Sequence, residues 1–300
     1  MWLLYAFSGP IAWAASIHID KYILGKYFKH GSVAVSMVFT AIIGLLMLPF
    51  IAAFVPGIFS LDPTEIAIMI VSGLLYMGGL LFYLFALQGE EASVVAMLTP
   101  VGPILAYGLA FLFLGEKLTG MQALGGLLVV GGAFLASLRL GSGKIRFRTK
   151  TTLWMTAAIV CLAFSSVIFK FFAVTESFWP ATFWTYVGEA LFGVGILAIR
   201  SERKIFTKLI RTNLRAVLGI NAVNELINLG GSLGARYALV LAPLALVQAV
   251  TSTTPLFAFF FALLITFFWP KLGKENLSRN ILLQKGLAAA LVFAGIWLAG

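Results

Sequence analysis

The chain is a succession of long apolar segments joined by short polar ones, and this pattern constrains its fold more than any other feature. Each segment is close to the roughly 20 residues that a helix needs to cross a bilayer. The apolar runs are continuous rather than alternating, so they indicate helices and not the strands of a barrel. The sequence predicts an all-α polytopic membrane protein with ten transmembrane helices, at about 2–22, 32–55, 65–87, 92–114, 119–140, 152–174, 181–200, 214–237, 241–268 and 282–299.

Composition excludes several classes of protein. Of the 300 residues, 61% are hydrophobic and 11% are charged, whereas a soluble chain has roughly 45–50% and about 25%. Ten helices use about two-thirds of the chain. They leave no room for a soluble catalytic domain, a nucleotide-binding cassette or a nucleic-acid-binding module. Basic loops explain the net charge of +10 better than a nucleic-acid partner does.

The basic residues predict how the chain is oriented. Most of them follow the first, fifth, seventh and ninth segments, and the rule that Lys and Arg collect in cytoplasmic loops places these four loops inside the cell. Both termini are then expected outside the cell (inner) membrane. The residues in the four loops are Lys21, Lys26, Lys29; Arg139, Lys144, Arg146, Arg148, Lys150; Arg200, Arg203, Lys204, Lys208, Arg211, Arg215; and Lys271, Lys274, Arg279, Lys285.

The chain also contains an internal repeat, which predicts its division into domains. Matching residues recur in order at an offset of about 150, which indicates a first five-helix repeat at 1–140 and a second at 152–300, joined by a basic linker at 141–151. Five is an odd number of spans, so the second repeat is expected upside down. Inverted repeats are typical of secondary transporters with a mid-membrane substrate site. The matches are Ser16 with Ser165, Lys21 with Lys170, Gly44 with Gly193, Gly78-Gly79 with Gly230-Gly231, and Pro103 with Pro255.

One predicted helix, at 214–237, carries a polar stripe. Asn221, Asn224, Glu225 and Asn228 recur at spacings of three and four, and Arg236 extends the stripe. Such groups are expensive in lipid, so they face protein or water. One interpretation is the wall of a substrate cavity, with Glu225 binding an amine or carrying a proton. The other is a hydrogen-bonded seam between helices.

Two further ionisable residues lie inside predicted helices. Glu189 is in the middle of the seventh segment, where an ionisable group is a functional candidate by default. The alternative for Glu189 is an ion pair with Lys170 or Arg236. Lys170 can bind a substrate carboxylate or phosphate, but it also lies near a helix end, from which its side chain can reach the headgroups.

Aromatic, amide and glycine residues complete the candidate site. Trp13, Tyr76 and Tyr83 can line a cavity, although Trp and Tyr are also common at membrane interfaces. Gln248 lies among Thr and Ser residues beside Pro255, in a predicted kink that matches one at Pro100 and Pro103. The alternative for these hydroxyls is bonding to their own backbone. Gly230 and Gly234 form a GxxxG pattern that allows close helix contact.

Two motifs resemble those of EamA-type members of the drug/metabolite transporter superfamily. The first is Trp13-Ala14-Ala15-Ser16 followed by Lys21, and the second is Leu114-Gly115-Glu116-Lys117-Leu118-Thr119 followed by Gly125 and Gly132. The second half departs from the pattern, with Trp269-Pro270-Lys271 in place of the Gly-Glu-Lys turn. The resemblance implies a ten-helix exporter or exchanger of small metabolites, often amino acids. It also implies cytoplasmic termini in many members, which differs from the orientation that the charges predict.

From these features we expect a secondary transporter of small polar metabolites that works by alternating access. Amino acids or related zwitterions are the expected substrates, because acidic and basic groups share one predicted cavity. Alternatives are an exporter of cationic drugs and a carrier of sugar phosphates or nucleotide sugars. A membrane-embedded enzyme is a remote alternative, since no catalytic cluster has recognisable spacing. The expected partners are a small-molecule substrate and the lipid bilayer, with protons as a candidate coupling ion, and the chain is expected to be a monomer or homodimer. No cofactor or metal is expected, because His18 and His30 are the only histidines.

Overall fold

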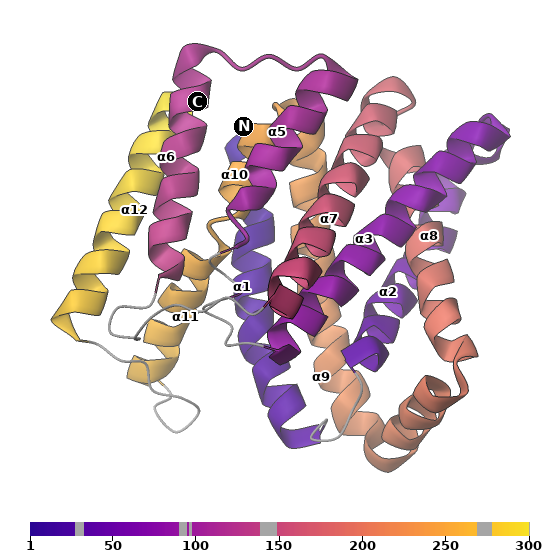
Figure 1. Ribbon diagram of the computed structural model, residues 1–300. Coiled ribbons are helices and arrows are strands. Elements are labelled where there is room, and N and C mark those ends of the chain that lie inside the picture. Colours follow the sequence, from indigo (N-terminus) through magenta and orange to yellow (C-terminus); the bar gives the residue numbers. More distant parts are fainter. Residues whose placement is uncertain (28–32, 90–94, 96–97, 139–148, 269–277, 300) are drawn as a thin grey trace.

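A computed structural model describes residues 1–27, 33–89, 95, 98–138, 149–268 and 278–299, and the side chains of 20–27, 89 and 212–218 are not among the described parts. The side chain of Lys21 is therefore not described, and His30, most of the basic linker at 141–151 and Trp269-Pro270-Lys271 lie outside the described residues. The described elements are all helical (Figure 1): α1 (Trp2–Tyr27), α2 (Val33–Phe54), the short 3-10 helix η1 (Ile58–Ser60), α3 (Pro63–Gly89), α5 (Val101–Leu114), α6 (Gly120–Ser137), α7 (Thr149–Thr175), α8 (Phe178–Ala198), α9 (Arg200–Leu241), α10 (Leu244–Thr251), α11 (Thr254–Phe268) and α12 (Arg279–Ala299).

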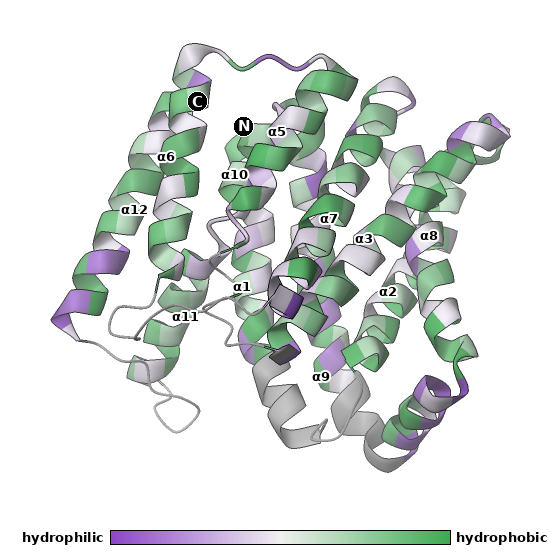
Figure 2. Cartoon of the chain, viewed as in Figure 1, coloured by the Kyte–Doolittle hydropathy of each residue, from purple (hydrophilic) through white to green (hydrophobic). Residues whose placement is uncertain are grey.

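The outer surface of the bundle is apolar. Figure 2 shows hydrophobic colour along the exposed sides of the helices, and large side chains such as Leu112, Phe293 and Trp297 are exposed. Seven helical stretches among the described residues are long and apolar enough to cross a membrane. The chain is thus an integral, multi-pass membrane protein. Helices α1, α5 and α9 occupy the three remaining predicted segments.

The two ends of the bundle differ in charge. Both termini lie at one end, together with the connection between α5 and α6 (Figure 1). Helices α7, α9 and α12 begin at the opposite end, where Lys150, Arg200 and Arg279 are exposed. The basic residues that the structure describes in the four loops therefore gather on one side, as the charge pattern predicts.

Two helices are interrupted where prolines are placed in the sequence. Helix α5 starts only after Pro100, and α10 ends at Thr251 before α11 begins at Thr254. At the second break, hydroxyls donate to carbonyls one turn earlier: Ser252 Oγ to Ala249 O at 2.6 Å and Thr253 Oγ1 to Val250 O at 2.6 Å. These hydroxyls bond to their own backbone, which is the structural alternative that the sequence left open.

Helix α9 is longer than the sequence predicts. Residues 200–213 were expected in a basic loop, but they form the first turns of a 42-residue helix. The reason is an apolar face on this basic segment. Its residues Ile205, Phe206 and Leu209 pack against α2, at Val35 and Phe39. Burial of this face stabilises the helix even though its other face is charged.

Small residues allow the central helices to approach closely. A Cβ on Gly73 of α3 would collide with the backbone of Thr185, and one on Gly188 of α8 would collide with the backbone of Ile70. Helices α1 and α9 also approach closely, but only one glycine of the predicted GxxxG pattern, Gly234, takes part in this contact. Gly231 and Gly234 face α1, whereas a Cβ on Gly230 would meet open space.

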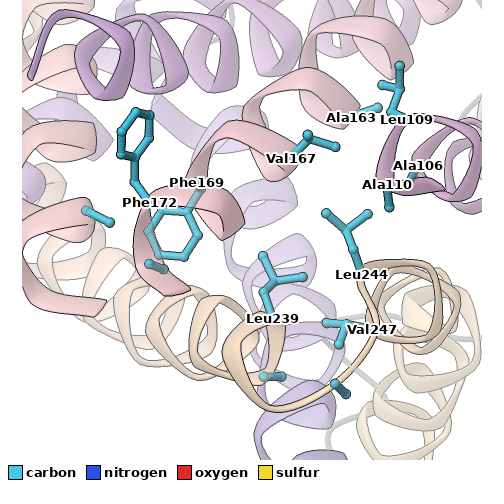
Figure 3. Packing of buried hydrophobic residues seen from close by; sticks show 14 of the residues in the cluster. Ala106, Leu109, Ala110, Ala163, Val167, Phe169, Phe172, Leu239, Leu244 and Val247 are labelled. Carbon is cyan, nitrogen blue, oxygen red and sulfur yellow. The ribbon is translucent and has the colours of Figure 1, made fainter. Parts of the chain in front are cut away.

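The largest hydrophobic cluster lies where α5, α7, α9 and α10 meet. Figure 3 shows Phe169 and Phe172 of α7 gathered with Leu239 of α9, and Leu244 of α10 facing Ala110 of α5. Through this cluster α7 packs against α5, α9 and α10.

Candidate functional site

A buried ion pair lies at the centre of the bundle. Arg236 Nη2 of α9 donates to Glu189 Oε1 of α8, and the two residues are only 8% and 3% exposed. Three aromatic rings surround the guanidinium, with Cζ at 5.0 Å from the ring centre of Tyr76, 5.0 Å from Tyr186 and 5.5 Å from Phe169. Ring faces attract a cation, so this aromatic cage stabilises Arg236 in a place without bulk water.

Several polar atoms around this pair have no hydrogen-bond partner in the part of the chain that the structure describes. They are Arg236 Nη1, the Tyr186 hydroxyl and the Thr185 hydroxyl, all buried. Buried polar groups in proteins are normally hydrogen-bonded, and each exception calls for an explanation. Arg236 Nη1 is a donor only, so the atom that would satisfy it is an acceptor, whereas the Tyr186 and Thr185 hydroxyls can each donate or accept.

The polar stripe on α9 continues from this pair along the same helix. Glu225 is buried and accepts a hydrogen bond from Thr40 Oγ1 of α2 at 3.2 Å. It lies eleven positions before Arg236, which is about three turns, or roughly 16 Å, on one face of the helix. Tyr76 lies close enough to Glu189, Glu225 and Arg236 to interact with all three charges. Asn221 and Asn224 are buried on the same stripe, and Asn228 is half-buried.

Lys170 forms a second, separate ion pair. Its Nζ pairs with Glu116, at the turn between α5 and α6, and also donates to the Ala242 carbonyl at 2.5 Å. Glu116 Oε2 in turn accepts from the Leu244 amide at 2.8 Å, at the first turn of α10. The Gly-Glu-Lys turn therefore binds the start of α10, and Lys170 is not part of the Arg236 cage.

The remaining predicted residues are dispersed. Gln248 of α10 donates from Nε2 to Ser166 Oγ of α7 at 2.9 Å. Tyr83 packs with Ala86, Val95 and Met155 in a different cluster. Trp13 is half-buried on α1, beside Gly9 of its own helix. The structure thus places Tyr76 and Glu189 at Arg236, leaves Glu225 further along α9 beside Thr40, and places Lys170, Gln248, Tyr83 and Trp13 elsewhere.

Sequence reasoning gave too little weight to two residues. The sequence presents Arg236 only as an extension of the stripe and an alternative partner for Glu189, whereas the structure places it at the centre of the cage. Glu116 was noted only within a motif, although it is the partner of Lys170. Its position in a turn concealed its role, since only the fold brings Leu244 and Lys170 to it. Among the described residues, no group of three or more His, Cys, Asp or Glu side chains is placed to hold a metal ion.

Comparisons with known proteins agree with this architecture. A family model described as the EamA-like transporter family matches residues 1–138. An uncharacterized protein of Methanocaldococcus jannaschii, MJ1333.1, is 32% identical over 97 residues, which cover 32% of this chain and 71% of that protein.

A solved crystal structure resembles the fold over its whole length. The TM-score is 0.64 and the sequence identity is 17%, and the match covers 99% of this chain and 97% of the other. At this identity the likeness concerns the fold alone. It extends the similarity to the second half of the chain, which lies beyond the residues that the family model matches.

Proposed function

This chain belongs to the EamA-like transporter family of the drug/metabolite transporter superfamily, and from that premise we propose that it is a secondary transporter of small zwitterions, most simply amino acids. The observation that carries the proposal is the buried pair of Arg236 and Glu189 in its aromatic cage.

An ion pair is the electrostatic complement of a zwitterion. When the pair separates, Arg236 can receive the substrate carboxylate and Glu189 can receive its amine, so every charge keeps an opposite partner. Arg presents a planar fork of donors that suits a carboxylate. The unpartnered Arg236 Nη1 and Tyr186 hydroxyl supply further donors for the carboxylate oxygens. The exchange adds no net charge to a medium in which unpaired charge is costly.

The alternative substrates fit the same groups less well. A cationic drug bound by Glu189 would leave the Arg236 guanidinium buried without a counter-charge. A sugar phosphate would require more positive charge than one arginine supplies. Lys170 does not supply it, because Glu116 and the Ala242 carbonyl already bind its ammonium group.

We include in the proposal ten membrane spans arranged as two inverted repeats, 1–140 and 152–300. The helix pairings support it, because the main contacts between the halves have counterparts. Helix α1 packs on α9 as α7 packs on α3, and α1 packs on α11 as α7 packs on α5. Helices α2 and α8 pack on one another, as do α6 and α12.

The low exposure of the central pair suits an occluded state of alternating access. Arg236 and Glu189 are almost wholly buried, so a substrate reaches them only when the two repeats move relative to one another. We place the basic end of the bundle in the cytoplasm and propose proton antiport or facilitated uniport as the driving process.

Transport by the purified protein in proteoliposomes tests the substrate class. Radiolabelled amino acids are supplied with and without a pH gradient, and competitors that each lack one charge are added. These are the methyl ester, which keeps only the amine charge, and the N-acetyl derivative, which keeps only the carboxylate. We expect saturable flux, with both derivatives competing about tenfold or more weakly than the parent, because each leaves one charged partner unsatisfied. Stronger competition by the ester would favour the cation alternative.

Glu225→Gln tests whether the stripe on α9 lines the substrate path. The variant keeps the shape of the side chain and its acceptor for Thr40 but removes the charge. We expect KM to rise about tenfold, as for loss of a charge-assisted interaction. Glu65→Gln, at the start of α3 and outside the bundle centre, is the matched control. Unchanged flux in Glu225→Gln would make the stripe a packing seam.

A further inference from the structure

The first turns of α9 present a basic hollow at one end of the bundle. It measures about 420 Å³ and is lined by Arg203, Lys204, Thr207, Lys208 and Arg211. Figure 2 shows hydrophilic colour concentrated in this part of the helix. Four of the five lining residues are cationic, and Glu202, the only acid between residues 200 and 211, does not line the hollow.

The hollow is held in place by the apolar face of the same helix segment. Ile205, Phe206 and Leu209 pack against α2, so the opposite face is turned outward, where all four cationic side chains are exposed. Their positions, 203, 204, 208 and 211, fall on one side of a helix. Because the backbone is helical and packed, binding an anion here requires no ordering of the chain.

An exposed apolar stripe at the end of α8 precedes this hollow along the chain. Leu191 and Val194 of α8 and Ile199, the residue between α8 and α9, are each at least half exposed, and Ile199 immediately precedes the first residue of α9. In a multi-pass membrane protein this stripe faces lipid. A molecule that contacts both features must carry a negative group at one end and hydrocarbon along the rest.

We propose that the hollow binds the phosphate of an anionic phospholipid whose acyl chains lie along the exposed stripe of α8. Clusters of Lys and Arg next to a membrane helix attract anionic headgroups. The proposal selects a lipid over a soluble phosphate because the exposed apolar stripe ends one turn before Arg203, the first residue that lines the hollow. The site is remote from the Arg236 cage and does not depend on the proposed substrate.

Binding to the detergent-purified full chain tests the proposal. The probes are phosphatidylglycerol and phosphatidylcholine with identical short acyl chains, and inorganic phosphate as a third arm. We expect the anionic lipid to bind about tenfold or more tightly than either of the other two, as several Lys and Arg contacts imply. Equal binding of the two lipids would overturn the proposal, and equal binding of inorganic phosphate would make the hollow a soluble-anion site instead.

Two double variants with the same change of charge locate the site. Lys208→Gln with Arg211→Gln removes two cations from the hollow, and Lys150→Gln with Arg279→Gln removes two exposed cations from the same end of the bundle. We expect the first pair to reduce the preference for phosphatidylglycerol about tenfold and the second by less than about twofold. Lys204→Gln, a milder variant, tests the same point if the first pair folds poorly. Equal losses in both pairs would show a general charge effect and overturn the site.

Discussion

Among the residues that the structure describes, two ion pairs lie inside the bundle, but their surroundings differ. Lys170 and Glu116 are each bound a second time by backbone, Lys170 to the Ala242 carbonyl and Glu116 to the Leu244 amide. Arg236 and Glu189 are surrounded by aromatic rings, and Arg236 Nη1 has no partner among the described residues.

This difference separates a structural role from a binding role. A charge whose hydrogen-bonding capacity is filled by backbone fixes the position of that backbone, and the Lys170 pair fixes the junction between α9 and α10. A charge held by ring faces keeps its remaining donors for another molecule. The comparison predicts that the two pairs respond differently when they are broken.

The largest effect is expected from Glu189→Gln. It leaves the Arg236 guanidinium buried without its counter-charge, which costs about 3–5 kcal/mol, and it removes the proposed amine partner. We expect amino-acid flux in proteoliposomes to fall to background and the melting temperature of the purified protein to fall. Both are measured on the same preparation.

The double variant Glu189→Gln with Arg236→Gln separates these two effects. Removing both charges relieves the unpaired guanidinium, so we expect much of the stability to return. Transport should stay absent, because neither charge of a zwitterion then has a partner. Recovery of transport along with stability would mean that the pair is only structural.

The matched changes at the other pair are expected to have a smaller effect. In Glu116→Gln, Lys170 keeps its bond to the Ala242 carbonyl, and the amide oxygen can still accept from Leu244. We expect a loss of about 1–3 kcal/mol in unfolding free energy. Flux should remain within about threefold of the wild type, since the proposed site keeps its charges.

Adding Lys170→Gln to Glu116→Gln completes the comparison. The double variant should regain part of the lost stability and keep its transport. Denaturation and flux assays run beside the Glu189 and Arg236 variants give the contrast directly. Loss of flux in a well-folded double variant would assign Lys170 to the substrate site after all.

The sequence predicted the helical class, the interrupted helices and the family, because these depend on local patterns. Apolar runs of the right length, prolines at corresponding places and the motif around Glu116 are all readable along the chain. Glu189 and Glu225 were identified because ionisable groups are rare in apolar helices.

The partners of these residues were harder to predict, since they depend on which helices pack together. Glu189 had two possible basic partners on helices that both contact α8, and only the placement of the side chains in the fold selects Arg236. The pairing of Glu116 with Lys170 joins a turn to a helix 54 positions later. The helical start of α9 was missed because its charges outnumber the three apolar residues that pack on α2.

The smallest effect on stability is expected from a change at Asp62. This exposed carboxylate accepts a hydrogen bond from a backbone amide, as Glu116 does, and so shows the effect of such a contact at an exposed position. The Thr64 amide donates to Asp62 Oδ1 at 2.7 Å at the start of α3, as the Leu244 amide donates to Glu116, but Asp62 is exposed. This hydrogen bond lowers the pKa of Asp62 below its usual value. A lowered pKa stabilises the fold above the unfolded-state pKa of about 3.9, and the contribution is lost as the pH falls through the folded-state pKa. Asp62→Asn should therefore lower the melting temperature slightly at neutral pH, less than any variant above, and the difference should vanish in acid. If the difference in melting temperature persists in acid, the charge of Asp62 does not contribute to stability. The Asp62–Thr64 contact would then not serve as a reference for the contact between Glu116 and the Leu244 amide.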